Sequence, residues 1–227
     1  MDVKALAIDV DGVITKLESA WKYIHEKLNL LDKAKINAEL FYKKKISYKK
    51  WAELDVALWK GISKEDFYNL LKEVEIRKGC AEFFSFLKEN NIKIFAISGG
   101  LTLLLEILSE KLHFDRYVAN DIIFENGIIN GKFKINVSPK NKGLILARFL
   151  KEFNIKSSQC IGIGDSEFDI PMLKYCGYKI AFNPKKIELI RISNEVIFSD
   201  TFYELFAHSS ILSFHFQIIQ LPYFFLQ

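Results

Sequence analysis

Cysteine is scarce in this chain, with three residues in 227. Cys80, Cys160 and Cys176 are widely separated, odd in number, and form no Cys-x-x-Cys pair. No histidine stands beside them at the spacing of a metal site. The cysteine pattern therefore argues against a disulfide-stabilised scaffold and against a zinc module.

A long apolar stretch is missing from the start of the chain. Lys4 precedes a short apolar run that ends at Asp9. This run is too short for a signal peptide, and no small residues of a cleavage site follow it. Together with the scarcity of cysteine, it predicts a cytoplasmic protein.

Neither sign of charge dominates the composition. The formal net charge is +4, which disfavours a nucleic-acid binder held mainly by neutralising phosphates. Apolar residues make up 50% of the chain and charged residues 26%, so a disordered chain is excluded. The length suits one domain with an insertion, or two small domains.

Five short apolar runs predict the strands of a parallel sheet. Each is rich in β-branched or small residues and ends abruptly at a polar residue or a turn, as strands buried on both faces do. Amphipathic segments lie between most of them, so we predict an α/β fold with a Rossmann-like parallel sheet. The runs are Ala5 to Ile8, Ile94 to Ile97, Cys160 to Ile163, Ile180 to Phe182 and Val196 to Phe198.

Residues 16–76 interrupt the alternation of strand and helix. Three apolar stripes at helical spacing, one of them begun by Ser63 with Asp66 three residues later, predict three or four helices. Between Asp115 and Val137, Asn-Gly pairs flanked by apolar residues predict a small β-hairpin excursion. We therefore expect a core of residues 1–15 and 77–206, an inserted helical subdomain of residues 16–76, and an apolar extension of residues 207–227.

Arginine is absent from residues 16–76, where thirteen lysines stand against ten acidic residues. The inserted segment thus carries most of the net positive charge. The lysine run Lys43 to Lys45 is typical of a solvated helix face, although it could also steer an anionic substrate.

Polar residues follow the predicted strands at their carboxyl ends, the edge where open α/β sheets bind ligands. Several carboxylates, a hydroxyl beside two glycines and one ammonium suit a hard cation and a phosphoryl group better than hydride or acyl transfer. This set predicts a Mg²⁺ cofactor and a small phosphorylated substrate. The residues are Asp9 and Asp11 after the first strand, Ser98-Gly99-Gly100 after the second, Asp165 and Asp169 after the third, and Lys142 upstream of the third.

Asp9 and Asp11 stand at i and i+2, which puts both side chains on one face of an extended backbone. One carboxylate can attack phosphorus and form an aspartyl-phosphate, while the other protonates the leaving oxygen and later takes a proton from water. Ser98 and the Gly99 amide would donate to phosphoryl oxygens, and Lys142 would add a fixed positive charge.

Four short motifs occur in order: Asp9-Val10-Asp11-Gly12-Val13-Ile14-Thr15, Ser98-Gly99-Gly100, Lys142-Gly143 and Gly164-Asp165-Ser166-Glu167-Phe168-Asp169. With these motifs the chain resembles the haloacid dehalogenase-like hydrolase superfamily and, within it, the phosphoserine phosphatase-like proteins. The resemblance covers roughly residues 3–206. Four motifs in this order are far more specific than any one of them.

The resemblance implies a role for each matching residue. Asp9 would be the nucleophile and a Mg²⁺ ligand. Asp11 would be the general acid/base and a ligand through its backbone carbonyl. Asp165 would be the third protein ligand, and Asp169 a ligand or a neighbour of the ligands. The phosphoryl group would be bound by Ser98, Gly99 and Lys142.

The resemblance also implies that residues 16–76 form a cap that closes over the site and selects the substrate. Glu18 falls where the family has a glutamate that contacts the substrate's amine. The family's cap arginine, which holds the substrate carboxylate, has no counterpart here, and Asp55 lies near its position. Phe168 replaces a common asparagine, so Ser166 is a candidate to supply the hydrogen bonding on that side. The chain thus departs from the family at residues that select phosphoserine.

Two other functions stay open on these residues. A phosphomutase on the same scaffold would return the phosphoryl group from Asp9 to a sugar. A non-catalytic binding module or phospho-receiver would carry phosphate on Asp9 as a signal, although receiver domains are about half this length and have no cap. A haloacid dehalogenase is disfavoured, because halide departure does not need the proton that Asp11 supplies.

Charged residues end at Glu204, and residues 207–227 carry none. The Ser, His and Gln residues and Pro222 make this apolar segment a poor membrane span, and its length only just suffices for one. We expect it to be an extra packing element or a contact in a homo-oligomer.

Overall fold

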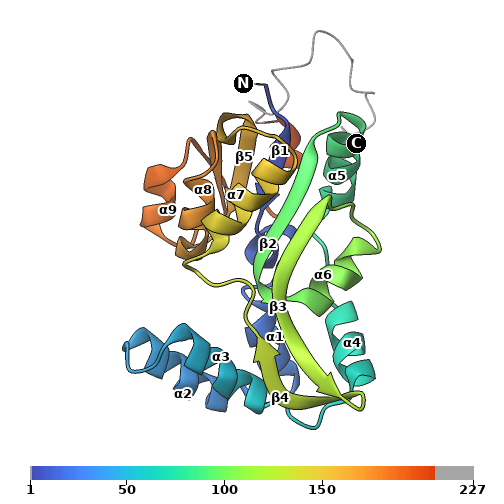
Figure 1. Cartoon of the computed structure of the whole chain (residues 1–227), viewed down its shortest axis with the longest axis vertical. Helices are drawn as coiled ribbons and strands as arrows, with labels where there is room; N and C mark the ends of the chain where they lie inside the picture. The colour runs from blue at the N-terminus through green and yellow to red at the C-terminus, as the bar shows by residue number, and fades with distance from the viewer. Residues whose placement is uncertain (1, 208–227) are drawn as a thin grey trace.

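A computed structural model describes residues 2–207, and its centre is a seven-stranded sheet (Figure 1). The strand order is β4-β3-β2-β1-β5-β6-β7, and all neighbours are parallel except β3 and β4. This confirms the predicted α/β class and the Rossmann-like parallel sheet. The strands are β1 (Ala5–Ile8), β2 (Lys93–Leu101), β3 (Arg116–Glu125), β4 (Ile128–Lys134), β5 (Cys160–Gly164), β6 (Tyr178–Phe182) and β7 (Glu195–Ile197).

The central strand β1 illustrates why the apolar runs form strands. All four of its residues are buried, and it pairs with β2 on one side and β5 on the other. Leu6 and Ile8 pack into the apolar core on one face of the sheet, whereas Ala5 and Ala7 pack into the core on the opposite face. This is the alternation expected for a strand, with both faces covered.

Helices cover the two faces of the sheet. Phe83 of α5 and Leu104 of α6 belong to the core that contains Leu6, and Leu146 of α7 and Met172 of α8 belong to the core on the other face. The carboxyl ends of β1, β2 and β5 therefore meet at one edge, between the two layers. The core helices are α5 (Cys80–Glu89), α6 (Thr102–Ser109), α7 (Lys142–Glu152), α8 (Ile170–Leu173), α9 (Ile187–Ile192) and α10 (Tyr203–Ala207).

Four more helices lie within residues 16–76 and occupy the lower half of Figure 1 together with β4. Two of them begin at serines whose hydroxyl accepts a backbone amide. Ser47 accepts from Lys50 at 3.1 Å, and Ser63 accepts from Asp66 at 3.0 Å, as the spacing of Ser63 and Asp66 predicts. The helices are α1 (Ala20–Lys27), α2 (Leu31–Tyr42), α3 (Tyr48–Ala57) and α4 (Lys64–Lys72).

The predicted hairpin is present, but its first strand is also a strand of the main sheet, which was not predicted. Residues of β3 up to Asn120 pair in parallel with β2, and the rest pair antiparallel with β4. Asn126 and Gly127 form the turn with positive φ, whereas the second predicted turn, Asn130-Gly131, lies inside β4. Exposed Arg116 and polar Asn120 interrupt the apolar pattern, so no continuous run marks the parallel part of β3.

The turn of the hairpin is joined to the inserted helices by backbone hydrogen bonds. The Gly61 amide donates to the Ile129 carbonyl at 3.0 Å, and the Ile129 amide donates to the Ile62 carbonyl at 2.9 Å. The Lys64 amide donates to the Gly127 carbonyl at 2.7 Å. The hairpin and the inserted helices are therefore joined to one another, rather than being two separate excursions.

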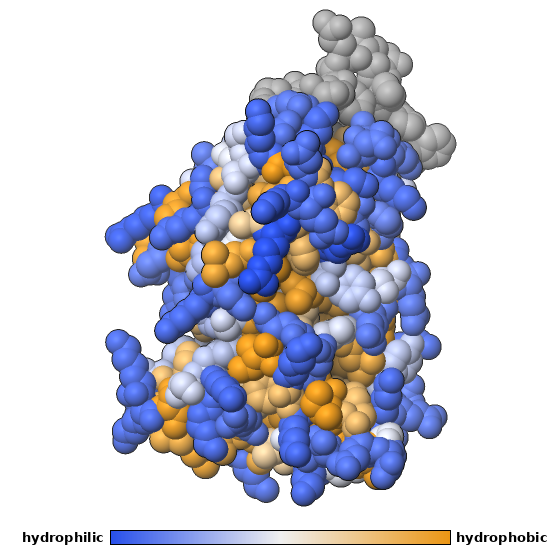
Figure 2. Space-filling view, in the orientation of Figure 1, coloured by the Kyte–Doolittle hydropathy of each residue, from blue (hydrophilic) through white to orange (hydrophobic). Residues whose placement is uncertain are grey.

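Hydrophilic residues cover much of the face seen in Figure 2, with apolar residues exposed between them. The three cysteines are buried free thiols. Within residues 2–207, none of the helices combines the length and apolarity needed to cross a bilayer. Apart from Ala207, the predicted apolar extension lies outside the described residues, and so does the oligomer contact predicted for it.

Candidate active site

The chain turns sharply after β1, over Val10–Ile14, and this turn holds Asp9 and Asp11 at the carboxyl edge of the sheet. Gly12 in the turn has a φ of +81°. A Cβ atom on it would lie 1.9 Å from Oδ2 of Asp165. Glycine is therefore required here both for the left-handed backbone and for the close approach to the next acidic residue.

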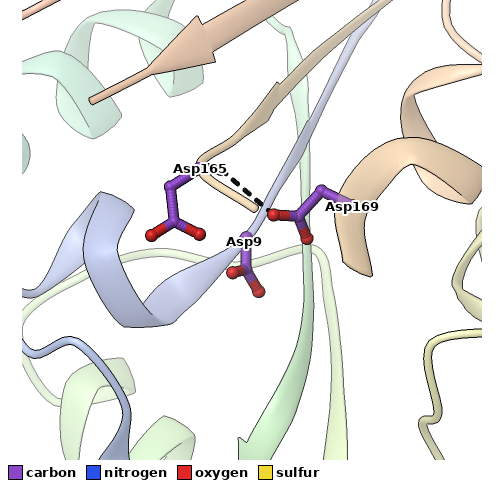
Figure 3. A group of neighbouring side chains, drawn as sticks. All are labelled: Asp9, Asp165 and Asp169. Carbon is purple, nitrogen blue, oxygen red and sulfur yellow. Dashed lines mark hydrogen bonds between the residues drawn. The ribbon is translucent and has the colours of Figure 1, made fainter. Parts of the chain in front are cut away.

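Three buried carboxylates meet at this edge (Figure 3). Asp9 follows β1, Asp165 follows β5, and Asp169 ends the short helical turn Glu167–Asp169. One oxygen of each lies within 4.8 Å of the others. Asp169 is held in place because its Oδ2 accepts hydrogen bonds from the Asp165 amide and from the amide and hydroxyl of Ser166, each at 3.1 Å.

Burial and mutual repulsion raise the pKa values of Asp9 and Asp165. Burial raises the pKa of Asp9 well above its usual value, and the neighbouring Asp169 raises it further, against the opposing effect of Lys142. Burial, followed by Asp169, raises the pKa of Asp165 to about 6. Carboxylate oxygens at this density are the donors that hard divalent cations bind, and the cluster fits such a cation.

Lys142, the first residue of α7, lies between two of these carboxylates. Its Nζ is 2.7 Å from Oδ1 of Asp9 and 2.6 Å from Oδ1 of Asp169, and its side chain is 3% exposed. Burial opposes the charge, but Asp169 and Asp9 outweigh it and raise the pKa of the ammonium. Lys142, and not the exposed Lys140, thus provides a fixed positive charge beside Asp9.

Asp11 faces the inserted helices rather than the three-carboxylate cluster. Its Oδ2 accepts a hydrogen bond from the amide of Ala20, the first residue of α1, at 2.8 Å. Its Oδ1 is buried and has no hydrogen-bond partner among residues 2–207. Burial raises the pKa of Asp11, which favours a carboxyl group that can carry a proton. The predicted use of its backbone carbonyl as a metal ligand stays a prediction.

The Ser98-Gly99-Gly100 motif continues β2 beyond the end that the sequence predicts. Ser98 is 2% exposed, and its Oγ accepts the Gly100 amide at 2.9 Å. The Gly99 carbonyl accepts from Nε1 of Trp21 at 3.1 Å and from Nδ2 of Asn120 at 2.9 Å. The motif is therefore tied both to helix α1 and to β3.

Asn120 is a site residue that the sequence analysis missed. It is fully buried, and besides donating to Gly99 it accepts the amides of Asn136 and Val137, each at 2.9 Å. It thus links the Gly99 segment to the connection that leads into α7 and Lys142. Its position on an unpredicted part of β3 explains why no local pattern revealed it.

Replacing Asn120 with alanine is expected to lower the free energy of unfolding by about 2–4 kcal/mol, because several buried backbone groups would lose a partner. Urea unfolding of the variant and of the unmodified chain measures this loss in the free energy of unfolding. Asn130→Ala is the matched control, because among residues 2–207 the Asn130 side chain bonds only the exposed amide of Lys132. It should change the free energy of unfolding by less than about 1 kcal/mol. Equal values for the two variants would show that Asn120 does not support the site.

Lys185, just after β6, is a second residue that was missed. Its Nζ lies 2.6 Å from Oδ2 of Asp165 and 3.2 Å from the Glu18 carbonyl, and its amide donates to the Asp165 carbonyl at 2.9 Å. The rule that ligands gather at strand ends would have found it, because the predicted strand ends at Phe182. Lys185 joins the carboxylate cluster to the start of the inserted helices.

Glu18 is solvent-exposed and pairs with Lys22 at 2.5 Å. The hydrogen bond from Lys22 lowers the pKa of Glu18. Glu18 and Phe168 both line the cavity described below, so each can approach a ligand. No hydrogen bond within residues 2–207 ties the Glu18 carboxylate to the core, which leaves it at the mouth of the site.

The site opens into a cavity of about 950 Å³ between the carboxyl edge of the sheet and helices α1–α3. The core side of this cavity is charged, and the helical side combines aromatic with polar residues. One space therefore brings together the acidic cluster and the inserted helices. Its lining includes Asp9, Asp11, Ser98, Gly99, Lys142, Asp165 and Lys185 from the core, and Trp21, His25, Tyr42, Tyr48, Trp51 and Asp55 from the helices.

Curated relatives of the chain include several phosphoserine phosphatases. The protein from Lactococcus lactis subsp. lactis is 29% identical over 181 residues, which are 79% of this chain and 83% of that protein. The protein from Albidiferax ferrireducens is 26% identical over 215 residues, 90% of each chain. This chain spans only 54% of the length of the relative from Archaeoglobus fulgidus, to which it is 25% identical over 185 residues.

Solved structures share the fold. A phosphoserine phosphatase in a phospho-aspartyl intermediate analogue form has a TM-score of 0.80 and 23% identity, covering 91% of this chain and 99% of that one. A substrate-bound phosphoserine phosphatase complex also has a TM-score of 0.80 and 23% identity, covering 91% of this chain and 98% of that one. At this identity the likeness concerns the fold.

The model of the family "haloacid dehalogenase-like hydrolase" matches residues 3–177, a span that contains all four motifs at the carboxyl edge of the sheet. This match and the relatives confirm the predicted resemblance to phosphoserine phosphatase-like proteins. The chain therefore belongs to the haloacid dehalogenase-like hydrolase family.

Proposed function

We propose that this chain is a Mg²⁺-dependent phosphatase that hydrolyses a small phosphate monoester through an aspartyl-phosphate on Asp9. The observation that carries this proposal is the setting of Asp9. Its carboxylate is buried, lies 2.7 Å from the Lys142 ammonium, shares a cluster with two further aspartates and lines a cavity large enough for a small ester. The phosphatase names of the relatives support the same reaction class.

In the first step a carboxylate oxygen of Asp9 forms a bond to phosphorus while the bond from phosphorus to the ester oxygen breaks. Asp11 gives its proton to the departing oxygen, which its raised pKa favours. In the second step water attacks the phosphorus and gives a proton to Asp11. The bond between Asp9 and phosphorus then breaks, which releases inorganic phosphate and restores both aspartates.

The phosphoryl oxygens would be bound by the Ser98 hydroxyl, the Gly99 amide and Lys142. Mg²⁺, held by Asp9, Asp165 and Asp169 and by the Asp11 carbonyl, would offset the charge that collects there. Residues 16–76 would act as the cap, because α1 reaches the site through Ala20 and Trp21. A cytoplasmic location belongs to the same proposal and rests on the sequence.

Release of inorganic phosphate tests the proposal. The purified chain is incubated with an aryl phosphate, phosphoserine, sugar phosphates and nucleotides, with Mg²⁺ or with a chelator. We expect release that requires the metal. An isomeric phosphate ester in place of free phosphate would indicate a phosphomutase. No release from any ester, the aryl phosphate included, would favour the binding or receiver function.

Mg²⁺ is also expected to stabilise the fold. At a concentration a hundredfold above its dissociation constant, binding to the folded state adds about 2.7 kcal/mol, which corresponds to a rise in Tm of roughly 5–10 °C. Asp165→Asn should remove most of this rise, since it removes a ligand. Asp200→Asn, at a side chain that is 87% exposed, should keep it. Thermal unfolding with and without Mg²⁺ measures the rise in Tm. The same rise in both variants would contradict the assigned ligands.

A further inference from the structure

A buried polar cluster lies in the wall of the cavity that helices α1–α3 provide. It consists of His25 on α1, Asn37 on α2, Asp55 on α3 and Trp59, two residues after α3. His25 and Asp55 are 2% and 4% exposed, and both line the cavity. This cluster takes no part in the proposed phosphoryl chemistry, so its polar groups need another explanation.

A single side-chain hydrogen bond indicates which ring nitrogen of His25 carries the proton. Nε1 of Trp59 can only donate, and it lies 3.2 Å from Nδ1 of His25. Nδ1 is therefore an acceptor, which puts the proton on Nε2 and leaves the imidazole neutral. Nε2 is buried and has no hydrogen-bond partner among residues 2–207, although Oδ2 of Asp55 lies 3.5 Å away. A donor is thus left unused in the cavity wall.

Asp55 is a buried carboxylate without a cation. Its Oδ1 accepts a hydrogen bond from Nδ2 of Asn37 at 2.8 Å. In the described part of the chain no lysine or arginine nitrogen lies within 4.0 Å of it, and the nearby His25 is neutral. Lys22 and Lys35 line the same cavity but pair with other acidic residues. A buried charge with neutral partners is costly, and a ligand that donates a proton or brings a positive charge would offset that cost.

We infer that Asp55 and His25 bind the end of the substrate remote from the phosphate, and that this end carries an ammonium or hydroxyl group rather than a carboxylate. An ammonium would supply the missing cation. A hydroxyl would donate to Asp55 and accept from Nε2 of His25. A carboxylate would meet Asp55 with like charge. The inference rests on the proposed phosphatase function and makes Asp55 a specificity-determining residue.

The test uses linear alkyl phosphates with two to five carbons, each ending in an amino, hydroxyl, methyl or carboxylate group. Phosphoserine is not diagnostic, because it carries both an ammonium and a carboxylate. At the chain length that fits, kcat/KM for the amino ester should exceed that for the methyl ester by about ten- to a hundredfold, as for hydrogen bonds to charged groups. The hydroxyl ester should fall between them, and the carboxylate ester should be the poorest substrate.

Asp55→Asn keeps the shape of the side chain and removes its charge. It should lower the ratio of kcat/KM for the amino ester to kcat/KM for the methyl ester by about tenfold or more. It should also raise kcat/KM for the carboxylate ester relative to that for the methyl ester. Glu53→Gln, on the same helix and 42% exposed, is the control and should leave the ratios as in the unmodified chain. Because ratios are compared, a loss of folded protein cannot mimic the effect.

Two outcomes overturn the inference. One is an amino-to-methyl ratio of kcat/KM near one at every chain length in the unmodified chain. If the aryl phosphate is still hydrolysed in that case, the proposed phosphatase function stands without the Asp55 pocket. The other is an unchanged order of substrates in Asp55→Asn. If no ester is hydrolysed, the phosphatase proposal fails. The Asp55 pocket is then tested by calorimetric binding of the same esters to the metal-free chain. Tighter binding of the amino than of the methyl ester supports the Asp55 pocket, and equal or absent binding refutes it.

Discussion

Asp9→Asn is expected to lower kcat by about 10⁴-fold or more, because the amide cannot take the place of the carboxylate as nucleophile. The variant should remain folded, since it removes one negative charge from a buried acidic cluster and leaves Lys142 paired with Asp169 at 2.6 Å. Steady-state phosphate release from an aryl phosphate with Mg²⁺ gives kcat. Mass spectrometry after acid quenching should detect a phosphorylated Asp9 peptide in the unmodified chain and none in the variant.

Asp32→Asn is the control for this experiment, because it makes the same chemical change at a side chain that is 97% exposed. Its turnover and its phosphopeptide should match those of the unmodified chain. Retained turnover in Asp9→Asn at the same metal concentration would contradict the aspartyl-phosphate mechanism. Turnover lost together with the folded state, seen by circular dichroism, would instead mean that Asp9 is needed for stability.

Lys142→Met should affect both catalysis and stability. The loss of a preorganised positive charge beside the phosphoryl group should lower kcat/KM by about 10²- to 10³-fold. Asp9 and Asp169 would then lose the cation that now lies between them, and breaking a buried ion pair costs about 3–5 kcal/mol. Methionine keeps much of the volume of lysine, so the effect reports the charge rather than a cavity.

Urea unfolding in the absence of metal measures the stability loss in Lys142→Met, and adding Mg²⁺ should recover part of it by supplying another cation. Lys140→Met is the matched control, because Lys140 is exposed and only two residues away. It should change neither kcat/KM nor stability appreciably. A Lys142→Met variant with unchanged kcat/KM would show that the phosphoryl charge is offset elsewhere, for instance by Lys185.

Most of the strands and most of the acidic site could be predicted because their signals are local. Buried strands such as β1 are continuous apolar runs, and the residue after each run lies at the carboxyl edge whatever the rest of the chain does. That rule brought Asp9, Ser98 and Asp165 to one edge before any contact was known. Lys142 lies upstream of β5, so its place depended on the resemblance to a family motif.

The contacts that complete the site have no local signal. Lys142 meets Asp9 across 133 positions, and Asn120 meets Gly99 from a strand whose apolar pattern is broken. His25 and Asp55 come together because α1 and α3 both pack against α2, and neither residue stands in a recognisable motif. Local patterns report which residues are buried, whereas the partners of a buried polar group depend on how distant segments pack. The amino-acid pattern thus predicted the sheet and the phosphoryl chemistry that we propose at its edge, whereas packing of the inserted helices decided which charged groups line the cavity beside it.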